Sequence, residues 1–152
     1  MKNKKALSKV ISFLLVLAII FVSIPLSASA EEAKIRFGVL SDIHYFADSL
    51  KSDCEEYDEW LYNKHKEYDD TDALLDNALD GILRNAVEDG STYVLIPGDM
   101  TKDGEKKSHE ALAARLAEFE EETGIQVFVV PGNHDINNSK SITFENGFAE
   151  PA

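Results

Sequence analysis

Three short apolar runs along the chain predict β-strands. They cover residues 34–40, 93–96 and 126–130, and glycine or Pro-Gly pairs bound the last two. β-branched and aromatic residues dominate all three runs, which is typical of strands buried on both faces of a sheet.

Two amphipathic stretches between these runs predict helices. Over residues 71–89, apolar pairs recur every four positions, with Asp70 or Thr71 available as the N-cap and Gly90 as the C-cap. Over residues 108–123, Ser108 is the expected N-cap and a glycine ends the helix. The order strand, helix, strand, helix, strand (β-α-β-α-β) indicates an α/β fold with a parallel sheet and crossover helices.

Residues 45–70 show no clear period and are rich in Asp, Glu, Tyr and Lys. The stretch is longer than an ordinary connection between a strand and a helix. Two interpretations stay open. It is either a lid or specificity loop, pinned by a helical turn at Trp60, Leu61 and Tyr62, or a solvated and half-ordered loop.

The first thirty residues differ from the rest. Four lysines precede an apolar run over residues 10–24, and Ala28-Ser29-Ala30 has the small-x-small pattern of a cleavage site. This arrangement predicts a signal peptide, residues 1–30, cleaved after Ala30, and an exported domain over residues 31–152. An uncleaved anchor is the alternative, although 15 residues are few for a membrane span. We expect no stable membrane span after cleavage.

Charge and cysteine content narrow the function. Residues 31–152 hold all 28 acidic residues but only 11 of the 15 basic ones, for a net charge of −17. We therefore expect no binding to nucleic acid or anionic membranes, and an anionic substrate would require a bound cation. Cys54 is the single cysteine, which excludes an intramolecular disulfide and a multi-cysteine zinc site. We interpret it as a free thiol.

Polar side chains follow each predicted strand. Because the carboxyl ends of parallel strands meet at one edge of a sheet, side chains from three strands are expected to converge there. The residues are Asp42, His44, Asp99, Asn133, His134 and Asp135. Each short motif alone also fits an ordinary turn, but their combination at three strand exits favours a metal site.

The residue types at these positions suit a centre of two cations. Asp42 and His44 can bind one ion if the backbone bends, Asp99 can bridge two, and Asn133 offers a neutral oxygen to the second. Mixed oxygen and imidazole ligands favour Mn, Fe, Zn or Ni. Two such cations can clamp a phosphoryl group during hydrolysis.

The last two polar residues suit supporting roles. His134 can contact the leaving oxygen or stabilise charge in the transition state. Asp135 can orient that imidazole or pair with a nearby cation.

With these motifs the sequence closely resembles the calcineurin-like metallophosphoesterase family, in particular its exported bacterial branch. The resemblance covers about residues 34–138 and lies in Asp42-x-His44, GDMTKDGEKKSH from Gly98, and GNHD from Gly132. It implies a sandwich of β-sheets flanked by helices, and an extracellular, cell-surface or cell-wall hydrolase of phosphomonoesters or phosphodiesters.

The resemblance also implies roles for the residues. Asp42 and His44 would bind the first metal, Asp99 would bridge, Asn133 would bind the second, and His134 would be the catalytic imidazole. Asp135 would support them.

The chain departs from the family pattern after the last motif. The family supplies further histidines in Gly-His and Gly-His-x-His segments, whereas residues 136–152 contain none and predict a polar loop. Two histidines remain. His65 is expected to be exposed, and His109 is expected to be either exposed or hydrogen-bonded to a loop. We therefore expect an N-terminal portion of the family domain with a second metal site incomplete. The alternative to an active enzyme is a truncated, non-catalytic remnant with partial metal binding.

Overall fold

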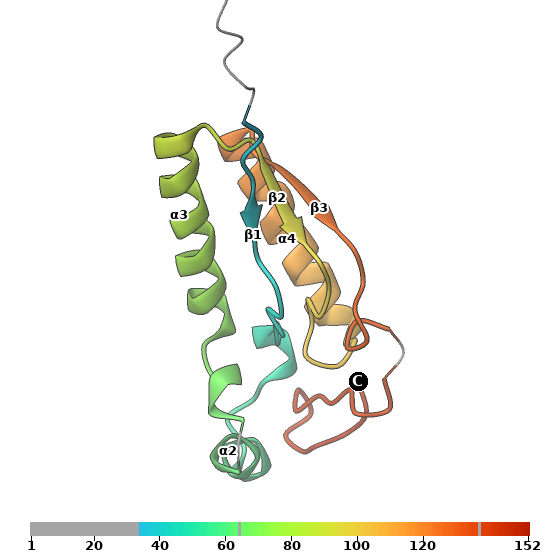
Figure 1. The fold of residues 1–152 in the computed structure, drawn as a ribbon. Helices are drawn as coiled ribbons and strands as arrows, with labels where there is room; N and C mark the ends of the chain where they lie inside the picture. Colours follow the sequence, from blue (N-terminus) through green and yellow to red (C-terminus); the bar gives the residue numbers. More distant parts are fainter. Residues whose placement is uncertain (1–33, 64, 137) are drawn as a thin grey trace, which may run out of the picture. The chain divides into compact units, whose positions relative to one another are not determined.

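A computed structural model of the chain describes residues 34–63, 65–136 and 138–152 (Figure 1). The expected signal peptide, residues 1–30, lies outside the described residues. Residues 35–152 form one compact unit. Among the described residues, no helix is both long enough and apolar enough to cross a membrane. The elements are β1 (Gly38–Val39), the 3-10 turn η1 (Asp48–Leu50), α2 (Glu55–Tyr62), the 3-10 turn η2 (Lys66–Tyr68), α3 (Thr71–Asp89), β2 (Tyr93–Ile96), α4 (Lys106–Thr123) and β3 (Gln126–Val129).

The three strands form a parallel sheet in the order β1-β2-β3, which confirms the predicted α/β fold. The first strand is shorter than the predicted residues 34–40. It pairs with β2 over two residues, and one further bond runs from the Leu40 N–H to the Leu95 carbonyl at 3.1 Å. Among the described residues β1 is an edge strand, and after a bend at Asp42 the chain pairs again with the segment after β2, in a bridge between Tyr45 and Thr101.

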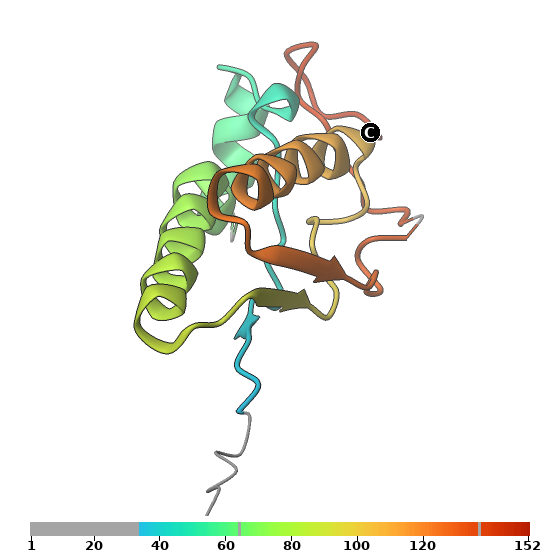
Figure 2. The ribbon, with the colours of Figure 1, turned by 90° about the horizontal axis from the view of Figure 1, so that it is seen from above.

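The sheet is covered on one face, so the prediction of strands buried on both faces was wrong for the described residues. Helices α3 and α4 lie on the same side of the sheet (Figure 2). Val94 on that side is fully buried, and a side chain at Gly38 would meet Ile82 of α3. Val39 and Phe128 lie in register with the middle strand on the other face and are 57% and 52% exposed. A continuous apolar run therefore did not reveal how many faces are covered.

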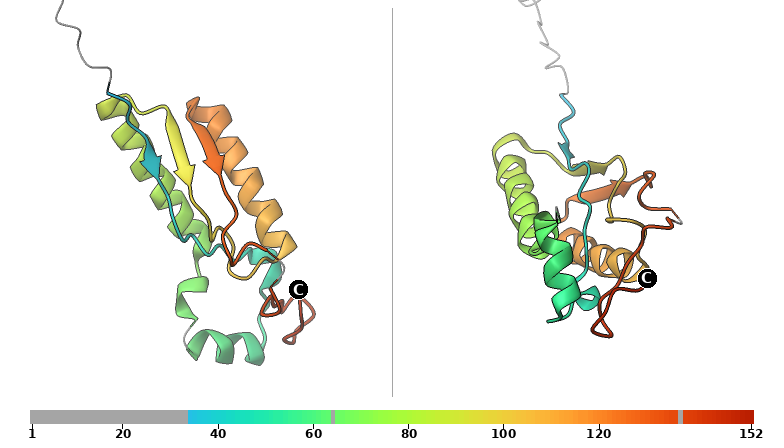
Figure 3. Two further views of the ribbon diagram at one scale, coloured as in Figure 1. Left: turned by 45° about the vertical axis from the view of Figure 1, so that its right-hand side comes forward. Right: turned by 90° about the horizontal axis from the view of Figure 1, so that it is seen from below.

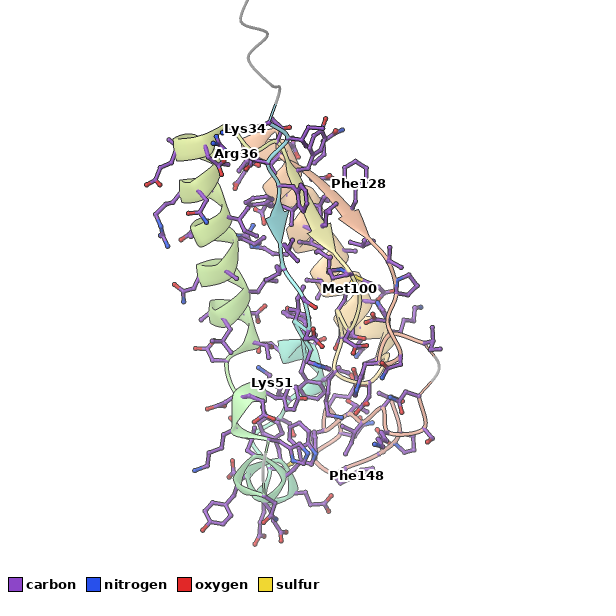
Figure 4. The ribbon with its side chains drawn as sticks, viewed as in Figure 1. Lys34, Arg36, Lys51, Met100, Phe128 and Phe148 are labelled. Carbon is purple, nitrogen blue, oxygen red and sulfur yellow. The ribbon has the colours of Figure 1, made fainter. Side chains whose placement is uncertain are left out.

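The uncovered face also shows in the side chains. Phe128 stands at the outside of β3, while Arg36, just before β1, lies near the end of α3 (Figure 4). There the Arg36 Nη1 donates to the Asp89 carbonyl at 2.9 Å. This bond ties the start of the sheet to the last turn of α3.

Helix α3 has the predicted bounds. Its first turn is capped by Asp70, whose Oδ1 accepts a hydrogen bond from the Ala73 N–H at 3.2 Å, and Gly90 ends it with φ of 75°. Helix α4 begins at Lys106, two residues earlier than predicted. Ser108 is not its N-cap, because the hydroxyl is buried and instead accepts a bond from the Ala47 N–H at 3.2 Å.

Residues 45–63 and 65–70 contain three helical pieces, which favours the interpretation as a pinned segment over that as a solvated loop. The stretch forms η1, α2 and η2, and the expected turn at Trp60 is part of α2. Its aromatic residues pack beyond the strand ends: the rings of Phe46 and Trp60 are 5.5 Å apart, and those of Tyr57 and Phe144 are 5.1 Å apart. Aromatic packing, which has no sequence period, holds this segment in place.

The segment after residue 135 is more than the predicted polar loop. Helix α2 and this C-terminal segment both lie beyond the carboxyl ends of the strands (Figure 3). Phe144 is completely buried, and its N–H donates to the Leu50 carbonyl at 2.7 Å. One apolar residue thus anchors an otherwise polar stretch to η1.

Two tyrosines of this aromatic packing predict an alkaline limit to stability. Burial, reinforced by nearby acidic residues, raises the pKa of Tyr57 and of Tyr68 to about 12. Unfolded tyrosine ionises near about 10, so this stabilisation is complete below that pH and is lost as the pH rises toward 12. We expect phenolate absorbance from these residues to appear together with loss of the helical circular-dichroism signal above about pH 11. Full tyrosine ionisation near pH 10 with intact helices would contradict this.

Candidate functional site

The backbone bends sharply where β1 and β2 end. Asp42, His44 and Asp99 have φ values of 53°, 47° and 51°, and they are the non-glycine residues with positive φ in the described part of the chain. This conformation is uncommon outside glycine and gathers at functional sites. Asp42 and His44 can bind the same ion only if the backbone between them bends, and this conformation provides that bend.

Two glycines let the turns after β2 and β3 touch. A Cβ on Gly98 would lie 2.8 Å from the Gly132 Cα, and a Cβ on Gly132 would lie 2.4 Å from the Asp99 nitrogen. Any other residue at Gly132 would push the two turns apart. The close approach allows the His134 N–H to donate to Asp99 Oδ1 at 2.9 Å.

His44, Asp99 and His134 converge at this edge of the sheet. One ligand atom from each lies within 4.8 Å of the other two, and all three residues are half-buried. The two imidazole rings meet edge to face, with centroids 4.6 Å apart. The Nδ1 of His44 is buried without a hydrogen-bond partner, which is rare for a polar atom and fits a metal ligand. We call these three residues the metal triad.

The imidazole of His134 is held on one side. Its Nδ1 lies 2.6 Å from the Lys102 carbonyl and 3.0 Å from Asp103 Oδ1. Because both partners are acceptors, Nδ1 carries the proton and Nε2 is left for a ligand or substrate. The sequence reasoning missed Asp103, although a second acid four residues after Asp99 was a visible signal.

Lys102 connects this site to the segment of residues 45–70. Its buried ammonium pairs with the Asp103 carboxylate. The same ammonium lies 5.6 Å from the ring centroid of Trp60 and 5.9 Å from that of Tyr68. Cation–π contacts of this kind favour a desolvated lysine. The aromatic residues Trp60 and Tyr68 therefore help to fix Lys102, whose carbonyl contacts the His134 ring.

Asp135 joins the turns after β2 and β3. Its Oδ1 accepts from the Thr101 N–H at 2.8 Å and from the Thr101 hydroxyl at 3.1 Å, while Oδ2 accepts from the Gly132 N–H at 2.7 Å. Burial by itself raises the pKa of Asp135, but the backbone hydrogen bonds outweigh it and leave the pKa below its usual range. The Asp135 carboxylate therefore bonds to the two turns and not to the His134 ring. The carboxylate that contacts this ring is Asp103.

The two remaining predicted ligands, Asp42 and Asn133, are exposed. Asp42 is exposed, and its Oδ1 is 4.0 Å from His44 Nε2. Its other oxygen accepts a hydrogen bond from the Ser41 hydroxyl. Asn133 directly precedes His134 in the turn after β3.

The other two histidines lie outside the metal triad. His109 Nε2 hydrogen-bonds to the Asp135 carbonyl at 2.9 Å, as one of its two predicted alternatives required. The predicted exposure of His65 was wrong. Its ring stacks on Trp60 with centroids 4.3 Å apart, and its Nδ1 bonds to the Trp60 carbonyl. Cys54 is a free thiol, as predicted, and its sulfur caps the start of α2.

Fold and site together define an α/β protein with a candidate metal site at the carboxyl edge of its sheet. The family model described as Calcineurin-like phosphoesterase matches residues 35–151, more than half of the chain. The chain therefore belongs to the calcineurin-like phosphoesterase family, whose members are hydrolases acting on phosphoester bonds. This confirms the resemblance to the family that the three motifs carry. A search of curated proteins found no match.

Proposed function

We propose that this chain is a metal-dependent phosphoesterase that hydrolyses phosphomonoesters or phosphodiesters. The observation that carries the proposal is the metal triad, His44, Asp99 and His134, assembled at the carboxyl edge of the sheet. The unpartnered Nδ1 of His44 and the family membership support it.

The donor set fits divalent cations of the Mn, Fe, Zn or Ni type. His44 and Asp99, with the adjacent Asp42, would hold the first, and Asp99 with Asn133 would contribute to the second. When bound, such cations polarise the phosphoryl group and make water a stronger nucleophile at neutral pH. The donor atoms therefore agree with the two metal ions that members of the family typically bind.

In the reaction the P–O bond to the alcohol breaks and a new P–O bond forms to the oxygen of water. His134 is the group we assign to the leaving alcohol: its doubly protonated ring would give the Nε2 proton to the departing oxygen, and the proton lost by the attacking water would restore the ring. The fixed Nδ1, held by the Lys102 carbonyl and Asp103, keeps Nε2 directed toward the site. Positioned proton donors of this kind contribute about 100- to 10,000-fold to a rate.

We also propose that the protein is exported and acts outside a bacterial cell or at its surface. The support is the n-region, apolar run and Ala-x-Ala pattern of residues 1–30. Fusing residues 1–30 to a reporter should send the reporter out of a bacterial cell, and a reporter retained in the cytoplasm would contradict export.

The proposed function is tested with the full chain loaded with Mn²⁺. Hydrolysis of p-nitrophenyl phosphate and bis-p-nitrophenyl phosphate is measured, with bound metal counted by native mass spectrometry. Turnover that disappears on chelation and returns with Mn²⁺ supports the proposal. Bound metal without turnover would contradict it and would fit the alternative of a non-catalytic remnant.

Replacing Asp103 by Asn is expected to lower kcat about 10- to 100-fold, because a carboxylate that orients a catalytic ring is lost. Steady-state kinetics should show the loss in kcat with KM little changed. Asp76→Asn, which removes an exposed partner of Arg115, is the matched control. Equal kcat values for the two variants would show that Asp103 does not position His134.

A further inference from the structure

A groove of about 340 Å³ opens beside the metal triad. It lies between the loop after β1 and the first half of α3, and its lining includes His44 and Asp42. Its volume falls in the range of small-molecule sites. A phosphoester bound at the metal triad would therefore have this groove next to it.

The rest of the lining is mainly apolar. Leu40, Leu75 and Ala78 contribute to it, with Leu74 of α3 also lining it and 59% exposed. Such a lining favours a hydrocarbon group over a hydrated one, because burying apolar surface removes it from water.

The charges along the groove have one sign. Besides Asp42, Glu67 lines the groove, and no Lys or Arg among the described residues does so. A second phosphate or a carboxylate placed there would meet repulsion without a compensating cation. The groove is continuous with the metal triad and lacks a cationic lining residue among those described. These two features define which part of a substrate it can receive.

We infer that the groove receives the alcohol portion of the substrate, and that this portion is an uncharged aryl or alkyl group. The inference rests on the proposed function and adds the substrate class to it. Phosphoesters of apolar alcohols are then preferred over nucleoside polyphosphates and other esters that carry further negative charge near the reacting phosphate.

The test is a binding measurement that requires no turnover. The full chain is loaded with Zn²⁺, and its affinities for phenylphosphonate and methylphosphonate are compared by isothermal titration calorimetry. Both ligands offer the same phosphonate to the metals, so the ratio of their affinities measures the contribution of the groove. We expect phenylphosphonate to bind about tenfold more tightly, as partial burial of a phenyl ring implies.

Two substitutions in α3 test whether the preference for phenylphosphonate arises from the groove. Ala78→Phe fills the groove and Leu74→Asp adds a charge to its lining, so each is expected to abolish the preference while methylphosphonate still binds. Val87→Asp is the matched control, because Val87 is also exposed on α3, at 81%, and does not line the groove.

The outcomes separate the two proposals. Equal affinities for both phosphonates in the unaltered chain, or a preference that survives in both Ala78→Phe and Leu74→Asp, would overturn the groove assignment and leave the proposed function standing. Failure to bind Zn²⁺ and either phosphonate would overturn the proposed function and the groove assignment together.

Discussion

Replacing Asp99 by Asn is expected to reduce phosphoesterase turnover by roughly a thousandfold and to weaken metal binding. The lost carboxylate charge costs several kcal/mol of cation binding and transition-state stabilisation, and each 1.4 kcal/mol is worth about tenfold in rate. The measurement is kcat/KM on bis-p-nitrophenyl phosphate at saturating Mn²⁺, together with bound metal per chain.

This substitution is well suited to the test because it should leave the fold intact. Asp99 has a φ of 51°, and Asn is among the residues that adopt this left-handed conformation most readily. An amide oxygen can still accept the bond that Asp99 Oδ1 receives from the His134 N–H. Asp80→Asn, on the exposed side of α3, controls for the loss of one negative charge. Turnover equal to that control would refute the role of Asp99.

Replacing His134 by Gln is expected to lower kcat about 100- to 10,000-fold, the contribution of a positioned proton donor. If His134 protonates the leaving alcohol, the loss depends on that alcohol. An alkyl phosphate, whose alkoxide leaves poorly, should lose more than p-nitrophenyl phosphate, whose phenolate leaves without help. The measurement is the ratio of the two kcat values in the variant and in the unaltered chain.

The same ratio separates proton donation from a purely metal-binding role. If His134 served only as a ligand in the metal triad, both esters would lose activity by the same factor, and that result would contradict the proton-donor assignment. His65→Gln is the control, since His65 stacks on Trp60 and lies outside the metal triad.

The predicted strands and helices came out largely right because period and caps are local properties. Asp70 and Gly90 bound α3 as expected, and the strand exits placed His44, Asp99 and His134 at one edge. Ser108 misled the prediction, because its hydroxyl bonds to Ala47, which is 61 residues away in the sequence. A local rule for helix caps cannot detect such a competing partner.

The support around His134 depends on contacts that a sequence pattern does not show. Asp103 reaches the His134 ring because Gly98 and Gly132 allow two turns to touch. Trp60 faces the Lys102 ammonium from a segment without any period. These features follow from three-dimensional packing, so residue types alone indicated candidate ligands but not the groups that orient them.

The central claim is that His44 and Asp99 of the metal triad bind a divalent cation together. It is tested most directly by titrating the full chain and its His44→Ala, Asp99→Asn and Asp80→Asn variants with Zn²⁺ in a calorimeter. We predict tight binding to the unaltered chain and to Asp80→Asn, with affinity reduced at least about tenfold in the other two. Equal affinities in all four proteins would contradict the claim.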